Sequence, residues 1–323
     1  MHNPNENQHG IAHFPISFFS MILGLAGFTI AYQKSEQILK IPFQISNYLL
    51  GFTILTLIVL SIIYLIKCFV SMDEVRNEFN HPIKLSFFPT VSISILLLSV
   101  AFLSIDLTIS KYLWIFGAAL HFLLTIKIVS IWIHHTKFKI VHMNPSWFIP
   151  AVGNVLVPIA GTTHFNAEVS WFYFSIGIIF WLILLIIFFN RIIFHDPLPD
   201  KLIPTLFILI APPAIGFIAL IKLNGEVNDF SKILYYSSLF FITLLFSQFK
   251  VFRKIQFYLS WWAYSFPISA ITIASILMYH ETNYDIFRFI AIALLITLNA
   301  IIAFLIIRTV YAVKNKSICV AEE

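Results

Sequence analysis

The segment WWAYSFPISA, residues 261–270, contains the feature that decides the predicted fold, a proline inside a run that could span a membrane. It lies in an uncharged run, residues 256–279, that is long enough to cross a bilayer, because about 20 apolar residues in a helix span the hydrocarbon core. Pro267 nevertheless stands near the middle of this run, directly after Phe266. A proline costs a helix about 3 kcal/mol, because it removes a backbone hydrogen bond and clashes with the preceding turn. A membrane helix that is broken in this way needs a reason in the architecture.

The composition of the whole chain excludes a water-soluble globular domain. Of its 323 residues, 59% are hydrophobic and only 11% are charged, which is typical of a protein that crosses a membrane many times. The sequence predicts an all-α polytopic membrane protein with a single transmembrane domain, residues 1–323, and short tails at about 1–13 and 309–323. Ten runs are long enough to span a bilayer, although the fifth is short, and we expect them to pair as five helical hairpins. The runs are 14–32, 44–66, 85–105, 112–133, 146–162, 168–189, 202–221, 231–249, 256–279 and 286–307.

Basic residues near the ends of these spans predict the orientation. Thirteen of the twenty Lys and Arg fall on the face that carries both termini, and six fall on the opposite face. Because basic residues close to span ends are retained in the cytoplasm, we expect both termini to be cytoplasmic in a plasma (inner) membrane protein. This asymmetry accounts for the net charge of +5, so no nucleic-acid partner is implied.

The prolines within the spans are confined to alternate helices. Eight of the fourteen prolines fall inside spans, and all eight are in odd-numbered spans. In lipid, a carbonyl freed by proline must be satisfied by neighbouring protein or by a water-filled cavity. We therefore predict an inner ring of five proline-kinked odd helices around a central pore, surrounded by an outer ring of five even helices. The kinks expected to line the pore are Pro15, Pro89, Pro150, Pro158, Pro212, Pro213 and Pro267.

An alternative is that these prolines only mark the starts of the spans, where proline is tolerated. The alternative suits four of the eight, namely Pro15, Pro89, Pro150 and Pro204. With the span boundaries given above, it does not account for the other four, which are Pro158, Pro212, Pro213 and Pro267.

The polarity of the odd spans favours passive conduction. They contain no Lys, Arg, Asp, Glu or His within the predicted boundaries, so they offer neither a proton relay nor a strong ion-binding site. Their small and weakly polar residues either mediate close helix packing or form walls that hydrate an ion without holding it. An anion is favoured if the broken helices point N–H groups into the path. The candidate lining residues are Ser17, Gly24, Ser94, Asn154, Ser269 and Thr272.

Three stretches resemble a known family. They are HFPISFFSMILGLAGFTIAY (residues 13–32), HMNPSWFIPAVGNVLVPIAG (142–161) and WWAYSFPISA (261–270). Together they are similar to the tellurite-resistance/dicarboxylate transporter family, which includes bacterial TehA proteins and the slow-type anion channels of plant guard cells. The match covers essentially the whole chain, and the second stretch is its most specific part.

The resemblance implies a homotrimer in which each protomer has its own pore. It also implies that a phenylalanine of the ninth span plugs this pore near mid-membrane, and in this sequence that residue is Phe266. A bulky apolar ring closes a path by steric block and by dewetting. Without the resemblance, a phenylalanine beside a kink is equally well a packing residue.

The function that follows is an anion channel or facilitator for small anions such as chloride or nitrate. The alternative within the same family is a transporter of C4-dicarboxylates such as malate, of sulfite or of tellurite-related oxyanions. A membrane-embedded enzyme would need an intramembrane cluster of His, Asp, Glu or Cys, which the odd spans lack. We therefore predict no catalytic residues, no cofactor and no metal site, with the lipid bilayer and small anions as partners.

Three smaller features complete the interpretation. Lys127 lies inside the fourth span, where it either extends its stem to the membrane surface or to another helix, or attracts anions. The stretch DEVRNEFNHP, residues 73–82, is expected to be a solvated loop, with contact to a partner or a neighbouring protomer as the alternative. Cys68 and Cys319 are expected to be free thiols, because their separation supports neither a disulfide framework nor a cysteine metal site.

Overall fold

The computed structural model describes residues 10–252, 254–315 and 318. Within these residues, nine helices are long and apolar enough to cross a membrane. The expected fifth span is also helical, but it is divided into short pieces between Pro145 and His164. The prediction of an all-α polytopic membrane protein is thus confirmed. Cys68 is a free thiol, and Cys319 lies outside the described residues.

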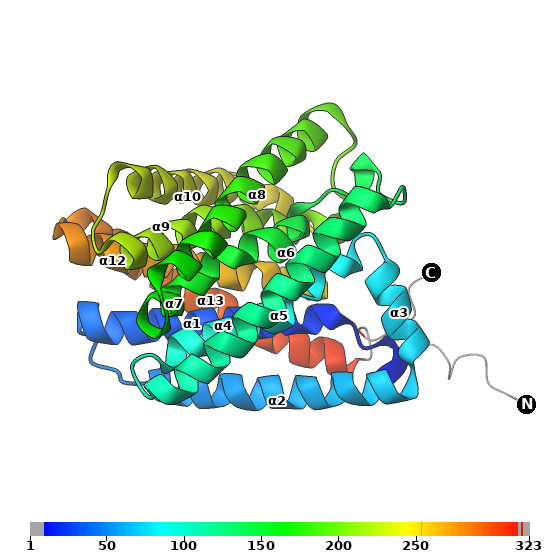
Figure 1. The fold of residues 1–323 in the computed structure, drawn as a ribbon, viewed down its shortest axis with the longest axis horizontal. Coiled ribbons are helices and arrows are strands. Elements are labelled where there is room, and N and C mark those ends of the chain that lie inside the picture. The colour runs from blue at the N-terminus through cyan, green and yellow to red at the C-terminus, as the bar shows by residue number, and fades with distance from the viewer. Residues whose placement is uncertain (1–9, 253, 316–317, 319–323) are drawn as a thin grey trace, which may run out of the picture.

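The helices follow one another as five hairpins (Figure 1). Each hairpin pairs an odd span, which ends in α1, α4, α7, α9 or α12, with the even helix that follows it. The short helix α3 (Met72–Asn80) lies between the first two hairpins, and α11 (Phe249–Phe252) lies before the last one. The remaining α-helices are α1 (Phe19–Lys34), α2 (Ser46–Val70), α4 (Thr90–Phe102), α5 (Leu107–His134), α6 (Phe148–Val152), α7 (Val157–His164), α8 (Ala167–Phe194), α9 (Ala211–Asn224), α10 (Asp229–Ser247), α12 (Ser265–Thr282) and α13 (Asp285–Lys314).

Every odd span begins with a stretch of 3₁₀-helix and continues as α-helix. A 3₁₀-helix is narrower and its hydrogen-bond geometry is poorer, so long runs are uncommon. Here one run, Asp200–Ile210, extends over eleven residues. The even helices, in contrast, are α-helical from their first residue, and side chains of Asp106, Asn166 and Asn228 cap three of them. The other 3₁₀ stretches that open odd spans are Ile16–Phe18, Lys84–Phe87, Pro145–Trp147 and Leu259–Tyr264.

The odd spans form a closed inner ring. Helix α1 packs against α4 and α12, α4 packs against α7, and α9 closes the ring by packing against α7 and α12. The even helices lie outside this ring, and four of them each contact two neighbouring inner helices. Helix α5 contacts α4 and α7, and α8 contacts α7 and α9. Helix α10 contacts α9 and α12, and α13 contacts α12 and α1. The odd spans are also more deeply buried. In the most apolar part of the four undivided odd spans, 67–83% of the residues are buried, whereas the corresponding share in the even helices is 17–39%.

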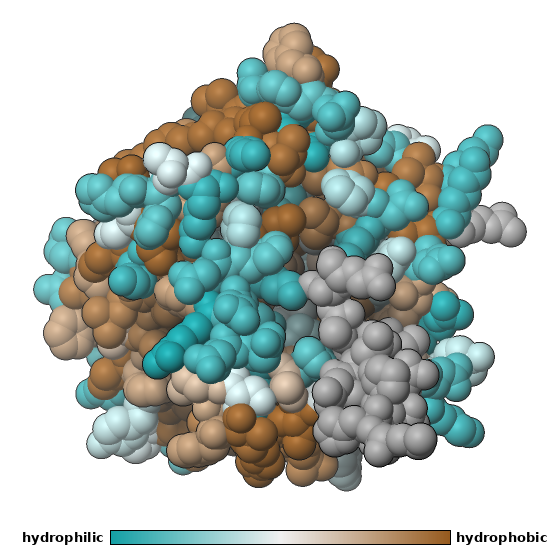
Figure 2. Space-filling view, turned by 90° about the vertical axis from the view of Figure 1, so that its right-hand side faces the viewer, coloured by the Kyte–Doolittle hydropathy of each residue, from teal (hydrophilic) through white to brown (hydrophobic). Residues whose placement is uncertain are grey.

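Both described ends of the chain lie at the same end of the bundle, on the right in Figure 1. We call this the termini end, and the opposite one the far end. Figure 2 looks onto the termini end, where hydrophilic residues gather near the centre and reach both sides, and hydrophobic residues form patches above and below them. Because all five odd spans start at the termini end, they run in the same direction, and their C-terminal ends face the far end.

The helices extend beyond several of the predicted boundaries. The last helix reaches Lys314 rather than residue 307, α1 includes Lys34, and α9 includes Lys222. A second correction concerns residues 73–82, where most of the expected loop is the amphipathic helix α3. The predicted boundaries stopped at the first charged residue, whereas a helix can extend past the apolar core of the bilayer.

Candidate functional site: two cavities inside the inner ring

A cavity of about 80 Å³ lies inside the inner ring in its termini half. All five odd spans contribute to its wall, and the lining side chains are almost entirely apolar. Five of them, one from each odd span, are Leu23, Ile93, Val152, Pro212 and Phe266. We call this the near cavity.

A second cavity, of about 60 Å³, lies inside the same ring in its far half. Its wall again takes residues from all five odd spans, and it also carries polar side chains, among them Gln33, Lys34 and Lys222. We call this the far cavity. The two cavities lie one after the other along the axis of the ring, because the near cavity is lined by earlier residues of the odd spans than the far cavity.

Three side chains line both cavities and so stand between them. They are Leu156 from the broken fifth span, Ile215 from α9 and Phe266 from α12. Phe266 is partly exposed, whereas its neighbours Ser265 and Pro267 are buried. The path through the ring is therefore narrowed by three apolar side chains, of which Phe266 is the largest.

The position of Phe266 follows from the start of α12. This helix begins at Ser265, after the 3₁₀ stretch Leu259–Tyr264, and Pro267 is its third residue. The first N–H groups of an α-helix have no partner within that α-helix, so proline is well tolerated there. The neighbouring helix α1 comes close to α12 at Gly27, where an added Cβ would lie 2.8 Å from Cβ of Ser269 and 3.3 Å from Cδ2 of Phe266.

The prolines of the inner ring stand mostly where 3₁₀-helix gives way to α-helix. Pro158 and the pair Pro212 and Pro213 occupy the first positions of α7 and α9. As expected, these residues and Pro267 do not stand at the starts of their spans, but each stands near the start of an α-helix that begins inside its span. Pro212 and Pro267 line the near cavity.

The remaining prolines lie closer to the termini end. Pro15 and Pro89 directly precede helical segments, and Pro150 lies within α6. Pro204 lies inside the long 3₁₀ stretch of the seventh span. Their contact with the path stays a prediction.

The six small or polar residues expected to line the pore have packing contacts instead of cavity contacts. Ser94, Ser269 and Thr272 donate hydrogen bonds to carbonyls one helical turn earlier. Asn154 donates to Oγ1 of Thr125 at 3.0 Å. None of the six lines either cavity, so the exposure of these residues to an open path stays a prediction. The six are Ser17, Gly24, Ser94, Asn154, Ser269 and Thr272.

Outside the ring, Lys127 is exposed on α5 and lines neither cavity. This position suits a stem that extends along the helix surface. His121, on the same outer helix, is fully buried and shares a 2.9 Å hydrogen bond with Oγ of Ser92.

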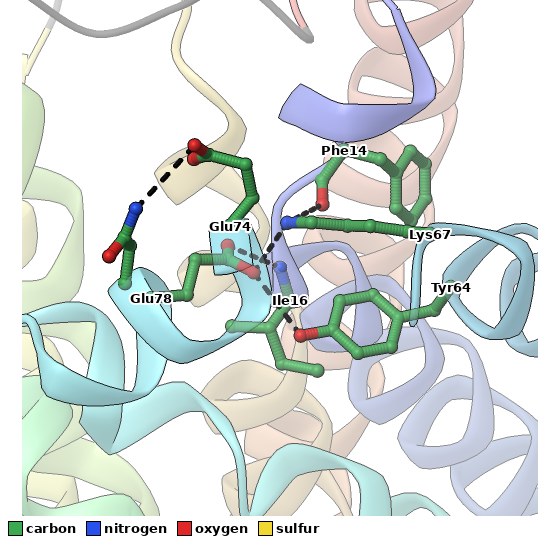
Figure 3. Close-up of polar contacts among 7 residues, drawn as sticks. Phe14, Ile16, Tyr64, Lys67, Glu74 and Glu78 are labelled. Atoms are coloured by element: carbon green, nitrogen blue, oxygen red, sulfur yellow. Dashed lines mark hydrogen bonds and ion pairs between the residues drawn. The ribbon is translucent and has the colours of Figure 1, made fainter. Parts of the chain in front are cut away.

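A buried ion pair joins the first hairpin to α3 at the termini end (Figure 3). Nζ of Lys67 lies 2.7 Å from Oε2 of Glu78 and donates to the carbonyl of Phe14 at 2.9 Å. The same carboxylate accepts the backbone N–H of Ile16 at 3.0 Å and the hydroxyl of Tyr64 at 3.2 Å. Helix α3 thereby holds the entry to the first odd span. This residue set was missed in the sequence, where only the alternation of charges in residues 73–82 hinted at it.

Several cations lie close together at the termini end. Burial lowers the pKa of His81, and the nearby Lys84, His142, Lys201 and Lys137 lower it further. His81 is therefore neutral near pH 7, and its Nδ1 accepts hydrogen bonds from the backbone N–H groups of Ile83 and Lys84.

Comparison with known proteins gives a family match over nearly the whole chain. Residues 13–310 match the family model SLAC1, which is described as a voltage-dependent anion channel. The S-type anion channel SLAH2 of Arabidopsis thaliana is 31% identical over 274 residues, which cover 82% of this chain and 53% of the plant channel.

Two prokaryotic proteins match over most of their own length. An uncharacterized transporter of Methanocaldococcus jannaschii is 28% identical over 314 residues, covering 89% of this chain and 91% of the relative. The tellurite resistance protein TehA homolog of Haemophilus influenzae is 24% identical over 307 residues, covering 92% and 90%. The chain spans about half the length of the first plant channels it matches.

Proposed function

The chain belongs to the SLAC1 family of voltage-dependent anion channels, and from this premise we propose that it passes small anions such as chloride and nitrate through the inner ring. The family consists of channels and transporters, so the protein is not an enzyme. In the proposed mechanism, an anion moves passively from one cavity to the other, past the ring of Phe266.

The observation that carries this proposal is that Phe266 lines both cavities. A phenyl ring between two spaces of about 80 and 60 Å³ leaves no room for a hydrated ion, and its apolar surface disfavours water. Leu156 and Ile215 complete an apolar constriction that contains no charge. Opening then requires only that the ring rotate away, without moving a charge through the membrane.

The wall of the path supports weak rather than tight binding of the anion. The near cavity is lined by apolar side chains and the polar hydroxyl of Ser20. Conduction needs sites that an ion can leave readily, and a carrier coupled to protons would generally need an ionisable residue along its path. Among the described residues, neither cavity is lined by Asp, Glu or His, and the ionisable residues along the path are Lys34 and Lys222 of the far cavity.

The test is the anion current of the purified protein in planar bilayers, with the wild type compared with Phe266→Ala. Removing the ring should raise the chloride and nitrate currents about tenfold or more, because it clears the narrowest point. Phe289→Ala is a matched control, since Phe289 is exposed on α13 and lines neither cavity.

Other results would overturn the proposal. If both forms are folded and carry no current, while malate uptake into proteoliposomes depends on a proton gradient, the protein is a dicarboxylate carrier. If sulfite or a tellurite-related oxyanion is the only anion that moves, the exporter alternative takes its place.

We further propose that the protein is a homotrimer in the plasma (inner) membrane with cytoplasmic termini. The excess of basic residues on the face of the termini supports the orientation. Native mass spectrometry of the protein in detergent tests the trimer, and labelling of single cysteines introduced in the loops tests the orientation.

A further inference from the structure

Two lysines stand at the far end of the path, and the constriction at Phe266 makes no use of them. Lys34 is the last residue of α1, Lys222 lies in the last turn of α9, and both line the far cavity. They are close enough for their charges to repel each other. Among the described residues, neither lysine forms an ion pair with a carboxylate, and the lining of the far cavity includes no Asp or Glu.

The acidic residue closest to Lys34 in the sequence is held elsewhere. Both carboxylate oxygens of Glu36 accept hydrogen bonds from Ser46, one from its backbone N–H at 2.9 Å and one from its hydroxyl. Glu36 thereby binds the start of α2, where a negative charge is favourable. The positive charge of the two lysines is therefore left for something other than Glu36.

The backbone next to Lys34 has an uncommon form. Helix α1 continues as a π-helical segment, Ser35–Leu39, and Gln37 in this segment accepts a 3.1 Å hydrogen bond from Nζ of Lys34. π-helical turns are rare and often occur at functional sites. Gln33 and Gln37 also line the far cavity. Nε2 of Gln33 donates one hydrogen to the carbonyl of Ala101 at 2.9 Å, so its second amide hydrogen and the amide of Gln37 are the groups that can donate to an anion.

The architecture explains why positive charge is needed at this end. All five odd spans run in the same direction, so their C-terminal ends face the far end. Each helix C-terminus carries the equivalent of about half a negative charge. Among the described residues, only the odd spans line the far cavity, so their C-termini act on an anion there more directly than the positive N-termini of the outer helices that begin at the same end. Lysines in the last turns of α1 and α9 offset this negative charge where the path opens.

We propose that Lys34 and Lys222 form an anion-recruiting site in the far cavity. A small anion such as chloride rests between the two ammonium groups before or after it passes the constriction. The inference rests on the proposed function, because it assigns a role within the same path. The same two charges raise the local concentration of anions at the far end, so they set how fast anions enter from that side.

The test uses the Phe266→Ala background, in which the path is open. Chloride entering from the far side should carry roughly threefold less current, or lower still, in the Lys34→Gln/Lys222→Gln variant, because the focusing charges are gone. The loss should be large at about 10 mM chloride, where the Debye length is about 30 Å, and small at about 1 M, where it is about 3 Å. Lys34→Arg/Lys222→Arg should restore the current, since arginine keeps the charge.

Lys111→Gln is the matched control, because Lys111 is exposed on α5 at the far end and lines neither cavity. This change should leave the current at low chloride unaltered. If Phe266→Ala conducts and the double lysine variant shows the same dependence on chloride concentration, the recruiting site is overturned and the proposed function stands. If Phe266→Ala itself carries no anion current, both fall.

Discussion

The inner and outer helices of this protein are both apolar enough to cross a membrane, yet they differ in almost every other respect. The outer helices are continuous α-helices with one face left exposed for lipid. The inner spans start as 3₁₀-helix, carry all the prolines of the spans and are buried on nearly every side. The difference teaches that hydrophobicity places a helix in the membrane, whereas the prolines indicate on which ring it lies.

The largest loss of stability is expected at a buried charge on an outer helix. Lys67 belongs to the outer helix α2 but is 1% exposed. Glu78→Gln would leave its ammonium buried without a counter-charge, which should lower the free energy of unfolding by about 3–5 kcal/mol. Thermal unfolding of the protein in detergent measures this loss.

The control for this prediction is Asp73→Asn on the same helix, α3. Asp73 and Arg76 form an exposed pair with atoms 3.3 Å apart, and such pairs contribute about 0–1 kcal/mol. Equal losses in the two variants would mean that burial of the Lys67–Glu78 pair does not matter.

A smaller loss of stability is expected when a proline is introduced into an outer helix or removed from an inner one. Leu182→Pro, in the middle of the outer helix α8, should cost about 3 kcal/mol because it removes a hydrogen bond from a continuous helix. Pro267→Ala should cost less than about 1 kcal/mol, since Pro267 stands in the first turn of α12 and its loss mainly frees the unfolded chain. A larger loss for Pro267→Ala than for Leu182→Pro would show that the inner prolines hold a strained shape.

The sequence was sufficient to predict much of this contrast. The confinement of Pro158, Pro212 and Pro267 to odd spans predicted which helices lie inside, because a broken helix cannot face lipid. Phe266 was singled out by its resemblance to a family, and its position between two cavities supports that choice.

Other parts of the site could not be read in advance. Leu156 and Ile215 lie far from Phe266 in the chain, and only their packing across the ring makes them part of one constriction. Both lie two residues from a proline, a signal that could have found them. Lys34 and Lys222 were placed outside their spans, because a hydropathy pattern ends at the first charge while the helix continues through it.

The smallest change in stability is expected from replacing one glycine by alanine in each ring. An added Cβ at Gly24 of α1 would lie 2.0 Å from Oγ and 2.6 Å from Cβ of Ser265, whereas at Gly51 of α2 it would meet nothing within 4 Å. Gly24→Ala should therefore cost about 1–3 kcal/mol through overpacking, and Gly51→Ala should stabilise its helix by about 0.5–1 kcal/mol. Thermal unfolding of the two variants measures the difference, and Ser265→Gly should recover part of the loss in Gly24→Ala by removing the clashing atoms. Because Ser265 directly precedes Phe266, the Gly24→Ala variant should also change the anion current. If neither the current nor the stability of this variant changed, α1 and α12 would be able to move apart without cost.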